Sequence, residues 1–536
     1  MHWFLFFVLE NGWEIRYNYD LGYYTKAGET AMRKIGMILL ALLLICGIAA
    51  AESTKAPDYI MEGYDGDDTG RTWDSNLFFT RMRDRTGVRF MYRQASGYSE
   101  WKTRVAAMIK GENLPDVLFK AELTPTETRK LYEAGVLIDL RPYITEENTP
   151  ALYALLEEHP EWKEAISMPD GAIAALPTFN RLQSNDFMWI NTQWLSRLGL
   201  KKPTTAEELT EVLRAFKTRD PNRNASEDEV PLTFIGMWEL RFLGHAYGMI
   251  DNDYYISVNG DGKVTSGLAS EQNRALLTWL HTLWAENLLD HNGFSQTDGM
   301  RQITDDSKTI PYGMIMGDTP LGTVPTSVSV NYDILEPLTF DGKQVYRDLT
   351  GDVIRGTFAI TRECANPAEI MAWVDYLFTE EGALLAQYGK EGEEFSIDSQ
   401  GKWSWIDSNE NVANKLIPER TIGTGSAIPG IALEDFQLKY TDEAARRIVE
   451  MMLAVKPYSL LPYPYVVLSD EDAAELAKIQ AELMGYAEQA MACFVTGDLE
   501  MNDSNWQTFC DTVKEKGLDR AVAIWQRVYD DLKSED

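Results

Sequence analysis

Oxygen-bearing side chains recur at alternate positions in the segment KTRDPNRNASEDEVPLT, residues 217–233. Loops that fold around Ca²⁺ present oxygen atoms in this rhythm, because alternate side chains can point to one centre. Counted from Asp220 as position 1, the oxygens stand at positions 1, 3, 5, 7, 9 and 10, on Asp220, Asn222, Asn224, Ser226, Asp228 and Glu229. The spacing predicts a calcium site. The alternative is an acidic turn in which the asparagines serve as turn formers.

Two positions of this segment depart from the EF-hand pattern. An EF-hand loop has Gly at position 6 and a bidentate Glu at position 12, whereas this chain has Ala225 and Pro231 there. Glu229 is then expected to supply the closing carboxylate. Ala225 weakens the pattern, since a loop glycine usually relieves a left-handed backbone at that point. A site filled by protein oxygens leaves little open coordination, so its expected role is structural.

The helix that leads into this loop is marked by its cap and by its apolar spacing. Thr204 and Glu207 follow Pro203 and match a capping box. Four apolar side chains then recur with helical spacing: Leu209, Val212, Leu213 and Phe216. The pattern predicts a helix that ends just before Asp220.

Strand-like and helix-like patterns alternate along the rest of the chain. Residues 116–119 (DVLF) predict a short buried strand, and the next helix is expected to be capped near Thr124 or Thr126 and ended by Gly135. A hairpin turn is expected at Gly262, and residues 471–536 read as mostly helical. This alternation predicts an α/β fold, built as two to four domains or as one large two-lobed unit.

The bulk composition excludes several classes of partner. The 536 residues carry a formal net charge of −33, and 45% of them are hydrophobic, which is ample for sizeable cores. A protein that binds nucleic acid needs a basic surface, so no nucleic-acid partner is expected. Adsorption to anionic lipid is disfavoured for the same reason. The high negative charge makes the molecules repel each other, and it fits a protein that works outside the cell in the presence of calcium.

The N-terminal region contains a secretion signal in its second half. Met32 is followed by two basic residues, by an apolar run over residues 35–50, and by an Ala-rich end at Ala51. We interpret residues 32–51 as a signal peptide cleaved after Ala51, and residues 1–31 as sequence upstream of the true start. Cys46 lies in a lipobox-like LLIC, so a lipid anchor is an alternative, although Ile45 is bulky. A membrane span is disfavoured because the run is too short.

The three cysteines beyond this segment do not form a recognisable pattern. Cys364, Cys493 and Cys510 give no disulfide framework and no C-x-x-C metal motif. Pairing of Cys493 with Cys510 stays open, and buried thiols are the favoured interpretation.

Sequence motifs of common enzymes are missing from the chain. It contains no G-x-S-x-G, H-E-x-x-H or Walker A sequence, and GTGSAIPG has Ile428 where a dinucleotide fingerprint needs its third glycine. A carboxylate pair for glycoside hydrolysis stays open, because such pairs are distant in sequence. We therefore expect no enzyme, and an adhesion protein is disfavoured by the lack of repeats.

Several segments together resemble one protein family. They are MIKGENLPDVLF, LYEAGVLIDLRPYI, DGAIAALP, NPAEIMAWVDYLFTEEGALLAQYGKEGEEF, CFVTGDLE and the long stretch from MWINTQWL to EDEVPL. They resemble the family 1 extracellular solute-binding proteins of ABC importers, in particular the long Gram-positive and alginate-oligosaccharide-binding subgroup. The resemblance covers nearly all of residues 56–536. In that subgroup the loop equivalent to residues 220–229 holds one structural calcium ion.

The resemblance implies a two-lobed periplasmic-binding-protein-like α/β fold of type II, with the ligand between the lobes. Matching segments place hinge crossings near residues 178–186, 354–358 and 457–465. Lobe 1 is then expected over residues 56–178 plus 359–456, and lobe 2 over residues 186–354 plus 466–536.

The resemblance also implies a function and a set of contacts. We expect an extracellular, monomeric component that captures a carbohydrate, preferably an oligosaccharide, and delivers it to ABC permease subunits. A peptide or another non-sugar solute is the alternative ligand. Sugars need flat aromatic faces and polar groups, and the candidate ligand contacts are Lys120, Asn180, Trp238, His245, Tyr247, Trp405 and Tyr463. The alternative for each is an ordinary core, hinge or loop residue.

Overall fold

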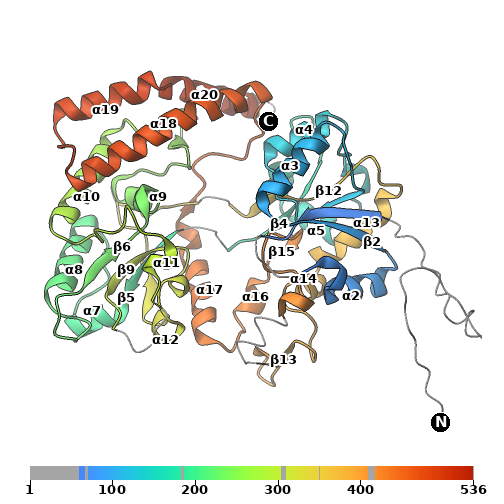
Figure 1. Ribbon diagram of the computed structural model, residues 1–536, viewed down its shortest axis with the longest axis horizontal. Coiled ribbons are helices and arrows are strands. Elements are labelled where there is room, and N and C mark those ends of the chain that lie inside the picture. Colours follow the sequence, from blue (N-terminus) through green and yellow to red (C-terminus); the bar gives the residue numbers. More distant parts are fainter. Residues whose placement is uncertain are drawn as a thin grey trace, which may run out of the picture. The chain divides into compact units, whose positions relative to one another are not determined.

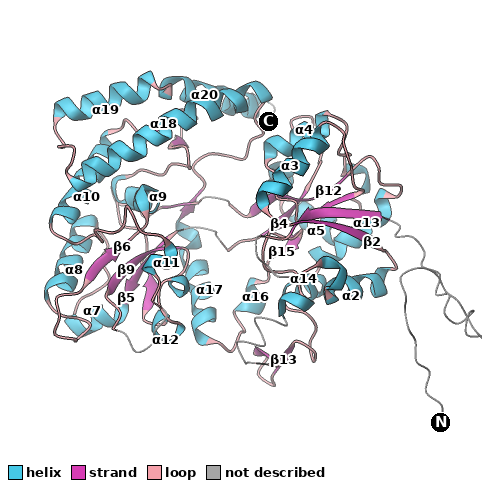
Figure 2. Ribbon diagram, viewed as in Figure 1, coloured by secondary structure: helices cyan, strands magenta, loops and turns pink. Residues whose placement is uncertain are grey.

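The computed structural model describes residues 59–66, 71–182, 186–303, 309–348, 351–407 and 417–534. The predicted signal segment, Cys46 and Ala51 lie outside these residues. Strands and helices alternate along the described chain (Figure 2), as the sequence predicts. No helix of the described part is long and apolar enough to cross a membrane.

The first sheet has six strands in the order β15-β4-β12-β3-β1-β2. All neighbouring strands run parallel except β12, which is antiparallel to both β3 and β4. The carboxyl ends of five strands and the amino end of β12 therefore share one edge. The strands are β1 (Tyr59–Tyr64), β2 (Phe90–Ala95), β3 (Val117–Phe119), β4 (Leu176–Phe179), β12 (Val353–Ile360) and β15 (Gly430–Ile431).

Helices cover both faces of this sheet (Figure 1). Val117 and Phe119 of β3 join one apolar cluster and Leu118 joins another, because alternate strand residues point to opposite faces. The first cluster packs α2 (Leu77–Thr86), α5 (Pro150–Glu158), α6 (Pro160–Ile166), α13 (Pro367–Asp375) and the short η1 (Trp73–Ser75) and η5 (Tyr376–Phe378). The second packs α3 (Tyr98–Ile109) and α4 (Pro125–Glu133).

The start of α4 follows its sequence signal. Thr124 caps the helix by accepting a hydrogen bond from the Glu127 backbone N–H at 3.1 Å, and the Glu127 carboxylate accepts one from the Thr124 N–H at 2.8 Å. Pro125 stands at the first helical position, where its missing N–H costs nothing. Gly135, just past the helix, has a left-handed φ of 63°. The predicted cap and stop are confirmed.

The second sheet has four strands in the order β10-β5-β9-β6. β6 is parallel to β9, whereas β5 is antiparallel to both β9 and β10. Its core takes in side chains from α7 (Thr192–Leu198), α8 (Ala206–Thr218), α10 (Glu271–Ala285) and α17 (Glu443–Val455). The strands are β5 (Phe187–Asn191), β6 (Val230–Thr233), β9 (Tyr312–Gly317) and β10 (Tyr332–Ile334).

The cap of α8 lies one residue later than predicted. Thr205 is the N-cap and its hydroxyl accepts a hydrogen bond from the Glu208 N–H at 3.2 Å. The Glu208 carboxylate turns back to the Thr204 N–H at 2.8 Å, so the prediction that Thr204 pairs with Glu207 is wrong. Two consecutive threonines and two consecutive glutamates offer the same pattern in two registers. The four apolar residues of the predicted helical face are buried as expected.

The C-terminal region is helical, as predicted. Figure 1 shows α18 (Asp470–Thr496), α19 (Asp503–Glu515) and α20 (Leu518–Ser534) lying together. α18 packs on α10, and α20 packs on the hairpin of β7 (Ile256–Val258) and β8 (Val264–Ser266). That hairpin turns at Gly262 with φ 75°, which confirms the predicted turn. Cys364, Cys493 and Cys510 are all free thiols, and Cys493 is only partly buried.

A small aromatic layer forms a separate cluster. The hairpin of β13 (Phe395–Ile397) and β14 (Trp403–Trp405) packs against α14 (Glu380–Gln387) and α16 (Glu434–Gln437). The Trp403 ring stacks on Phe436 and Tyr440, with centroids 4.6 and 4.1 Å away.

Chain segments cross between the two sheets at several places. The Asn180 N–H donates to the Asp352 carbonyl at 2.9 Å, so two of the predicted crossings lie side by side. α17 packs in the core of the second sheet, although residues up to 456 are expected in lobe 1. Its packing favours a third crossing between α16 and α17. The segment after β16 (Ser459–Leu460) then passes beside α4, where Arg129 donates to the Leu468 carbonyl.

Candidate ligand-binding site

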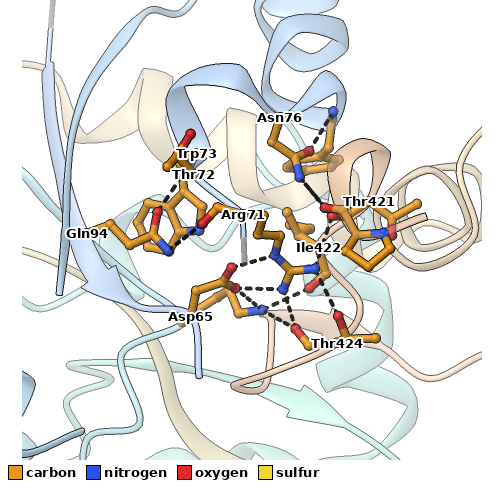
Figure 3. A network of polar contacts seen from close by, with 12 residues as sticks. Asp65, Arg71, Thr72, Trp73, Asn76, Gln94, Thr421, Ile422 and Thr424 are labelled. Carbon is orange, nitrogen blue, oxygen red and sulfur yellow. Dashed lines mark hydrogen bonds and ion pairs between the residues drawn. The ribbon is translucent and has the colours of Figure 1, made fainter. Parts of the chain in front are cut away.

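A buried ion network occupies the carboxyl edge of the first sheet (Figure 3). Asp65 follows β1, and its carboxylate contacts Lys120, which follows β3, at 2.6 Å. Arg71 also donates to this carboxylate, at 2.8 Å through Nη2. All three side chains are buried. Burial lowers the pKa of Lys120 to about 8, while the charge of Asp65 opposes that shift.

The same cations hold a later segment across the sheet edge. Lys120 Nζ donates to the carbonyls of Ile422 and Thr424 at 2.9 and 2.7 Å. Arg71 donates to the Thr424 hydroxyl at 2.9 Å and to the Thr424 carbonyl. Figure 3 shows these groups converging on the Asp65 side chain. Residues 421–424 are thereby fixed over the ends of β1 and β3.

This network changes the interpretation of Lys120. The strand before it is as predicted, but its side chain is 0% exposed and its ammonium group bonds inside the protein. We therefore do not include Lys120 among the proposed ligand contacts. Sequence reasoning missed Asp65 and Arg71, whose only local signal is a charged, Gly-containing stretch directly after a strand.

Asn180 lies at the same edge, directly after β4. It is partly buried, and its side-chain carbonyl accepts a hydrogen bond from the Leu182 N–H at 2.9 Å. Its neighbour Arg181 pairs with Glu434 at 3.6 Å. Asn180 therefore remains a proposed contact at the first crossing.

Trp238 lies at the carboxyl edge of the second sheet. It belongs to the short α9 (Gly236–Leu240), which begins three residues after β6. Its side chain is 46% exposed, an unusual exposure for tryptophan. Of the seven predicted ligand contacts, Trp238 best fits a flat apolar platform for a sugar ring.

A buried ion pair fixes α9 in place. Glu239 pairs with Arg301 of α11 (Asp298–Arg301) at 3.1 Å, and Arg301 also donates to the Met316 carbonyl of β9 at 2.8 Å. Burial raises the pKa of Glu239, because Arg301 offsets only part of the desolvation cost. This pair links α9, the helix that carries Trp238, to α11 and β9.

His245 and Tyr247 lie further along the chain on η3 (Arg241–Tyr247). His245 is buried, and its Nδ1 lies 2.6 Å from the Phe242 carbonyl. Burial lowers its pKa to about 4, so the ring is neutral at pH 7. Tyr247 packs beside Trp279 of α10. The structure does not bring either side chain to Trp238.

Trp405 and Tyr463 belong to two other clusters. Trp405 lies in the aromatic layer, where it stacks with Tyr388 at a centroid distance of 5.9 Å. Tyr463 is buried, and its hydroxyl donates to the Trp525 carbonyl at 2.6 Å. These contacts are internal packing, so neither residue joins the proposed ligand surface.

A cavity of about 780 Å³ lies along the crossing segments. Asp348 and residues of the segments 351–355 and 459–469 line it together with parts of α6 and α20. None of the seven predicted ligand contacts lines this cavity. The cavity reaches Val353 at the amino end of β12, on the carboxyl edge of the first sheet. Ligands of open α/β sheets bind outside the carboxyl ends of strands, so we place the ligand at the two sheet edges, where Asn180 and Trp238 lie.

The predicted calcium loop is a turn rich in side-chain hydrogen bonds. The Asp220 carboxylate accepts from the N–H groups of Asn224 and Ala225 at 3.0 and 3.1 Å. The amide groups of Asn222 and Asn224 donate to Asp228. Among the described residues, no three carboxylate, imidazole or thiol groups converge as a metal site.

Two features of this loop nevertheless fit a cation. Glu229 is 3% exposed, and its buried Oε1 has no hydrogen-bond partner among the described groups. Burial raises the pKa of Glu229, and the charges of Asp228 and Asp220 raise it further. Ala225 has φ 57°, the left-handed conformation expected at that position. Rotation of the two asparagine amides would present oxygens in place of N–H groups.

The chain matches the sequence model of a known family. Residues 77–384, more than half of the chain, match the model described as bacterial extracellular solute-binding protein. The chain belongs to this family. The resemblance found in the sequence is thus confirmed.

Relatives of this family span nearly the whole chain. The fructooligosaccharide ABC transporter substrate-binding protein FusA of Streptococcus pneumoniae is 26% identical, over 92% of this chain and 96% of that protein. A FusA EF-hand mutant solved in complex with fructo-nystose has a TM-score of 0.68 at 23% identity, covering 89% and 100%. An extracellular solute-binding protein from Bifidobacterium longum subsp. infantis gives 0.75 at 20% identity, covering 89% and 98%. The predicted two-lobed α/β fold of a solute-binding protein is confirmed.

Proposed function

We propose that this protein captures an oligosaccharide outside the cell and delivers it to the permease subunits of an ABC importer. The observation that carries the proposal is the exposed Trp238 indole at the carboxyl edge of the second sheet. Indole faces pack against the C–H groups of sugar rings, while neighbouring carboxylates accept hydrogen bonds from hydroxyls. Membership of an extracellular solute-binding family and the likeness to FusA support this ligand class.

We propose two lobes, each built around one sheet. Lobe 1 takes in residues 56–178 and the part from 359 through α16, and lobe 2 takes in residues 186–354, α17 and residues 466–536. Asn180 at the first crossing and Trp238 on lobe 2 are the proposed ligand contacts. Closure of the lobes would bring both edges onto the sugar.

We further propose secretion through residues 32–51. Cleavage after Ala51 remains the proposed route, and lipidation at Cys46 remains the alternative. The protein is proposed to act as a monomer and to leave its ligand intact.

Binding of nystose by purified residues 52–536 tests the proposed function. The melting temperature should rise by several degrees at saturating nystose, because a ligand bound only by the folded state stabilises it by mass action. The melting temperature is also measured with a panel of other neutral and acidic oligosaccharides and of short peptides. Chromatography of each incubated sugar should show no cleavage.

Three outcomes distinguish the candidate functions. A shift with intact sugar supports the importer component. A shift accompanied by cleavage products would identify a glycoside hydrolase instead. A rise in melting temperature with peptides alone would indicate that a protein of this fold captures peptides instead of sugars.

We also infer that residues 220–229 hold one structural Ca²⁺. Asp220, Asn222 and Asn224 would supply side-chain oxygens, Ser226 its carbonyl oxygen, and Asp228 and Glu229 the closing carboxylates. The bound ion would offset two of the three carboxylate charges and satisfy the buried Glu229 oxygen. An EF-hand mutant of the similar protein FusA has been solved, which supports a calcium-binding loop in this group of proteins.

Calcium is expected to raise the melting temperature of the purified protein. The free energy of unfolding should rise by about 4 kcal/mol when free calcium exceeds the dissociation constant about a thousandfold. Calorimetry in 1 mM CaCl₂ and in EDTA measures it. Glu229→Gln should remove most of the difference, because it deletes the one carboxylate that is buried in the loop.

Two matched variants control this prediction. Glu227→Gln changes an exposed carboxylate of the same loop and should leave the calcium effect intact. Ala225→Gly should stabilise the bound form by about 1 kcal/mol, because glycine adopts φ 57° without a Cβ penalty. Equal melting temperatures in calcium and EDTA would identify the segment as an acidic turn.

A further inference from the structure

Two carboxylates flank the last residue pair of the β5–β9 ladder, at the carboxyl edge of the second sheet. Phe187 of β5 pairs with Gly317 of β9 in the antiparallel ladder, so Asp186 and Asp318 are the next residues on the two strands. Asp186 is buried and Asp318 is exposed. Burial raises the pKa of Asp186 to about 6, and the charge of Asp318 adds to the shift. A like charge nearby disfavours ionisation of a carboxyl group, so the two residues repel each other.

These carboxylates belong to the surface that carries Trp238. A Cβ atom on Gly317 would lie 3.6 Å from Arg301 Nη2 and 4.0 Å from Glu239 Oε1. The residue before Asp318 therefore abuts the ion pair that holds α9. The charge of Asp186 also raises the pKa of Glu239, which places the two carboxylates within electrostatic reach.

The cations around this edge already have carboxylate partners. Three arginines act favourably on Asp186: Arg347, Arg301 and Arg241. Arg301 pairs with Glu239 and, at 3.1 Å, with Asp298. Arg241 and Arg347 share the Asp253 carboxylate. Among the described residues, these three guanidinium groups stand against five carboxyl groups. Even with Glu239 protonated, as its pKa of about 8 favours at pH 7, four carboxylates remain and the edge keeps a negative excess.

Exposed apolar side chains flank the acidic groups. Trp238 stands beside Glu239, and Met300, which is 68% exposed, stands beside Arg301. The two helices joined by the Glu239–Arg301 pair, α9 and α11, therefore each have one exposed apolar residue. Such a surface suits the apolar faces and hydroxyl groups of a sugar, since carboxylates accept hydrogen bonds from hydroxyls.

We propose that the Asp186–Asp318 pair beside Trp238 selects uncharged oligosaccharides and rejects sugars that carry carboxylates. An anionic sugar at Trp238 would meet Asp318, while the three arginines described at this edge already pair with other carboxylates, which is discrimination by like-charge repulsion. The inference rests on the proposed function and narrows its substrate class. Asp318 acts as a specificity determinant, and the buried Asp186 keeps its neighbourhood acidic.

A matched pair of sugars tests the inference. Nystose, or the neutral sugar with the largest shift in the panel, is compared by calorimetry with the same sugar whose primary hydroxyls are oxidised to carboxylates. The neutral form should bind at least tenfold more tightly to the wild-type protein. The ratio should shrink in 0.5 M NaCl, because exposed charges are screened.

Variants separate charge repulsion from the loss of hydroxyl contacts. Asp318→Asn should raise the affinity for the oxidised sugar, relative to that for the neutral sugar, about tenfold. Asp261→Asn, in the exposed β7–β8 turn, should change neither. Should Asp318→Asn fail to fold, the salt dependence of the wild-type ratio still decides the question.

Equal or tighter binding of the oxidised sugar by the wild-type protein would overturn the inference and leave the proposed function standing. A preference for the neutral sugar that neither salt nor Asp318→Asn reduces would overturn it as well. If no sugar of the panel binds, the proposed function fails, and the inference fails with it.

Discussion

Replacing Asp65 with asparagine is expected to lower the free energy of unfolding by about 3–5 kcal/mol. The change leaves the buried cations of Arg71 and Lys120 without the carboxylate they share. Leaving a buried charge unpaired costs more free energy than the intact ion pair contributes to stability. Urea denaturation followed by tryptophan fluorescence measures the loss, and the melting temperature should fall with it.

Two further variants show whether the loss comes from unpaired cations. Asp74→Asn, an exposed carboxylate nearby in η1, should change the unfolding free energy by less than about 0.5 kcal/mol. Adding Lys120→Met to Asp65→Asn should recover part of the loss, because it removes one of the stranded charges. A drop below 1 kcal/mol for Asp65→Asn alone would contradict the structural role assigned to the network.

Replacing Trp238 with alanine is expected to weaken oligosaccharide binding about 30-fold, which corresponds to roughly 2 kcal/mol. The variant removes the flat apolar face on which we place the sugar. Because the indole is 46% exposed, the fold should lose little, and the melting temperature without ligand should stay within a few degrees. Titration calorimetry with nystose measures the affinity.

Tyr254→Ala provides the matched control for this prediction. Tyr254 is 43% exposed, but its ring stacks on Trp525 of α20 near the β7–β8 hairpin. Its loss should leave the affinity for nystose unchanged. Similar losses for the two variants, or full binding by Trp238→Ala, would argue that the sugar lies elsewhere.

Local signals in the sequence predicted local structure well. The cap of α4 was predicted near Thr124 or Thr126, and Thr124 forms it. The cap of α8 offers two equivalent registers, and the wrong one was chosen. The left-handed backbone at Ala225 was expected from its loop position alone. Where neighbouring residues decide the conformation, the pattern is sufficient.

Long-range contacts explain what the sequence could not provide. Lys120 was correctly placed at a strand end, but its partner Asp65 lies 55 residues earlier, and its carbonyl acceptors lie some 300 residues later. Nothing in the segment around Lys120 reveals that these groups will bury its charge. The facing of Asp186 and Asp318 likewise depends on the register of two strands far apart in sequence.

The order in which the first sheet is assembled has a consequence for biogenesis. Its first three strands lie before residue 120, but β12 begins at Val353, and the carbonyls that satisfy Arg71 and Lys120 belong to residues 421–424. A nascent chain shorter than about 430 residues thus carries two cations and a sheet edge that nothing yet covers. Such non-local closure slows folding. For a member of an extracellular family, slow closure of this sheet would favour an unfolded chain during transfer across a membrane.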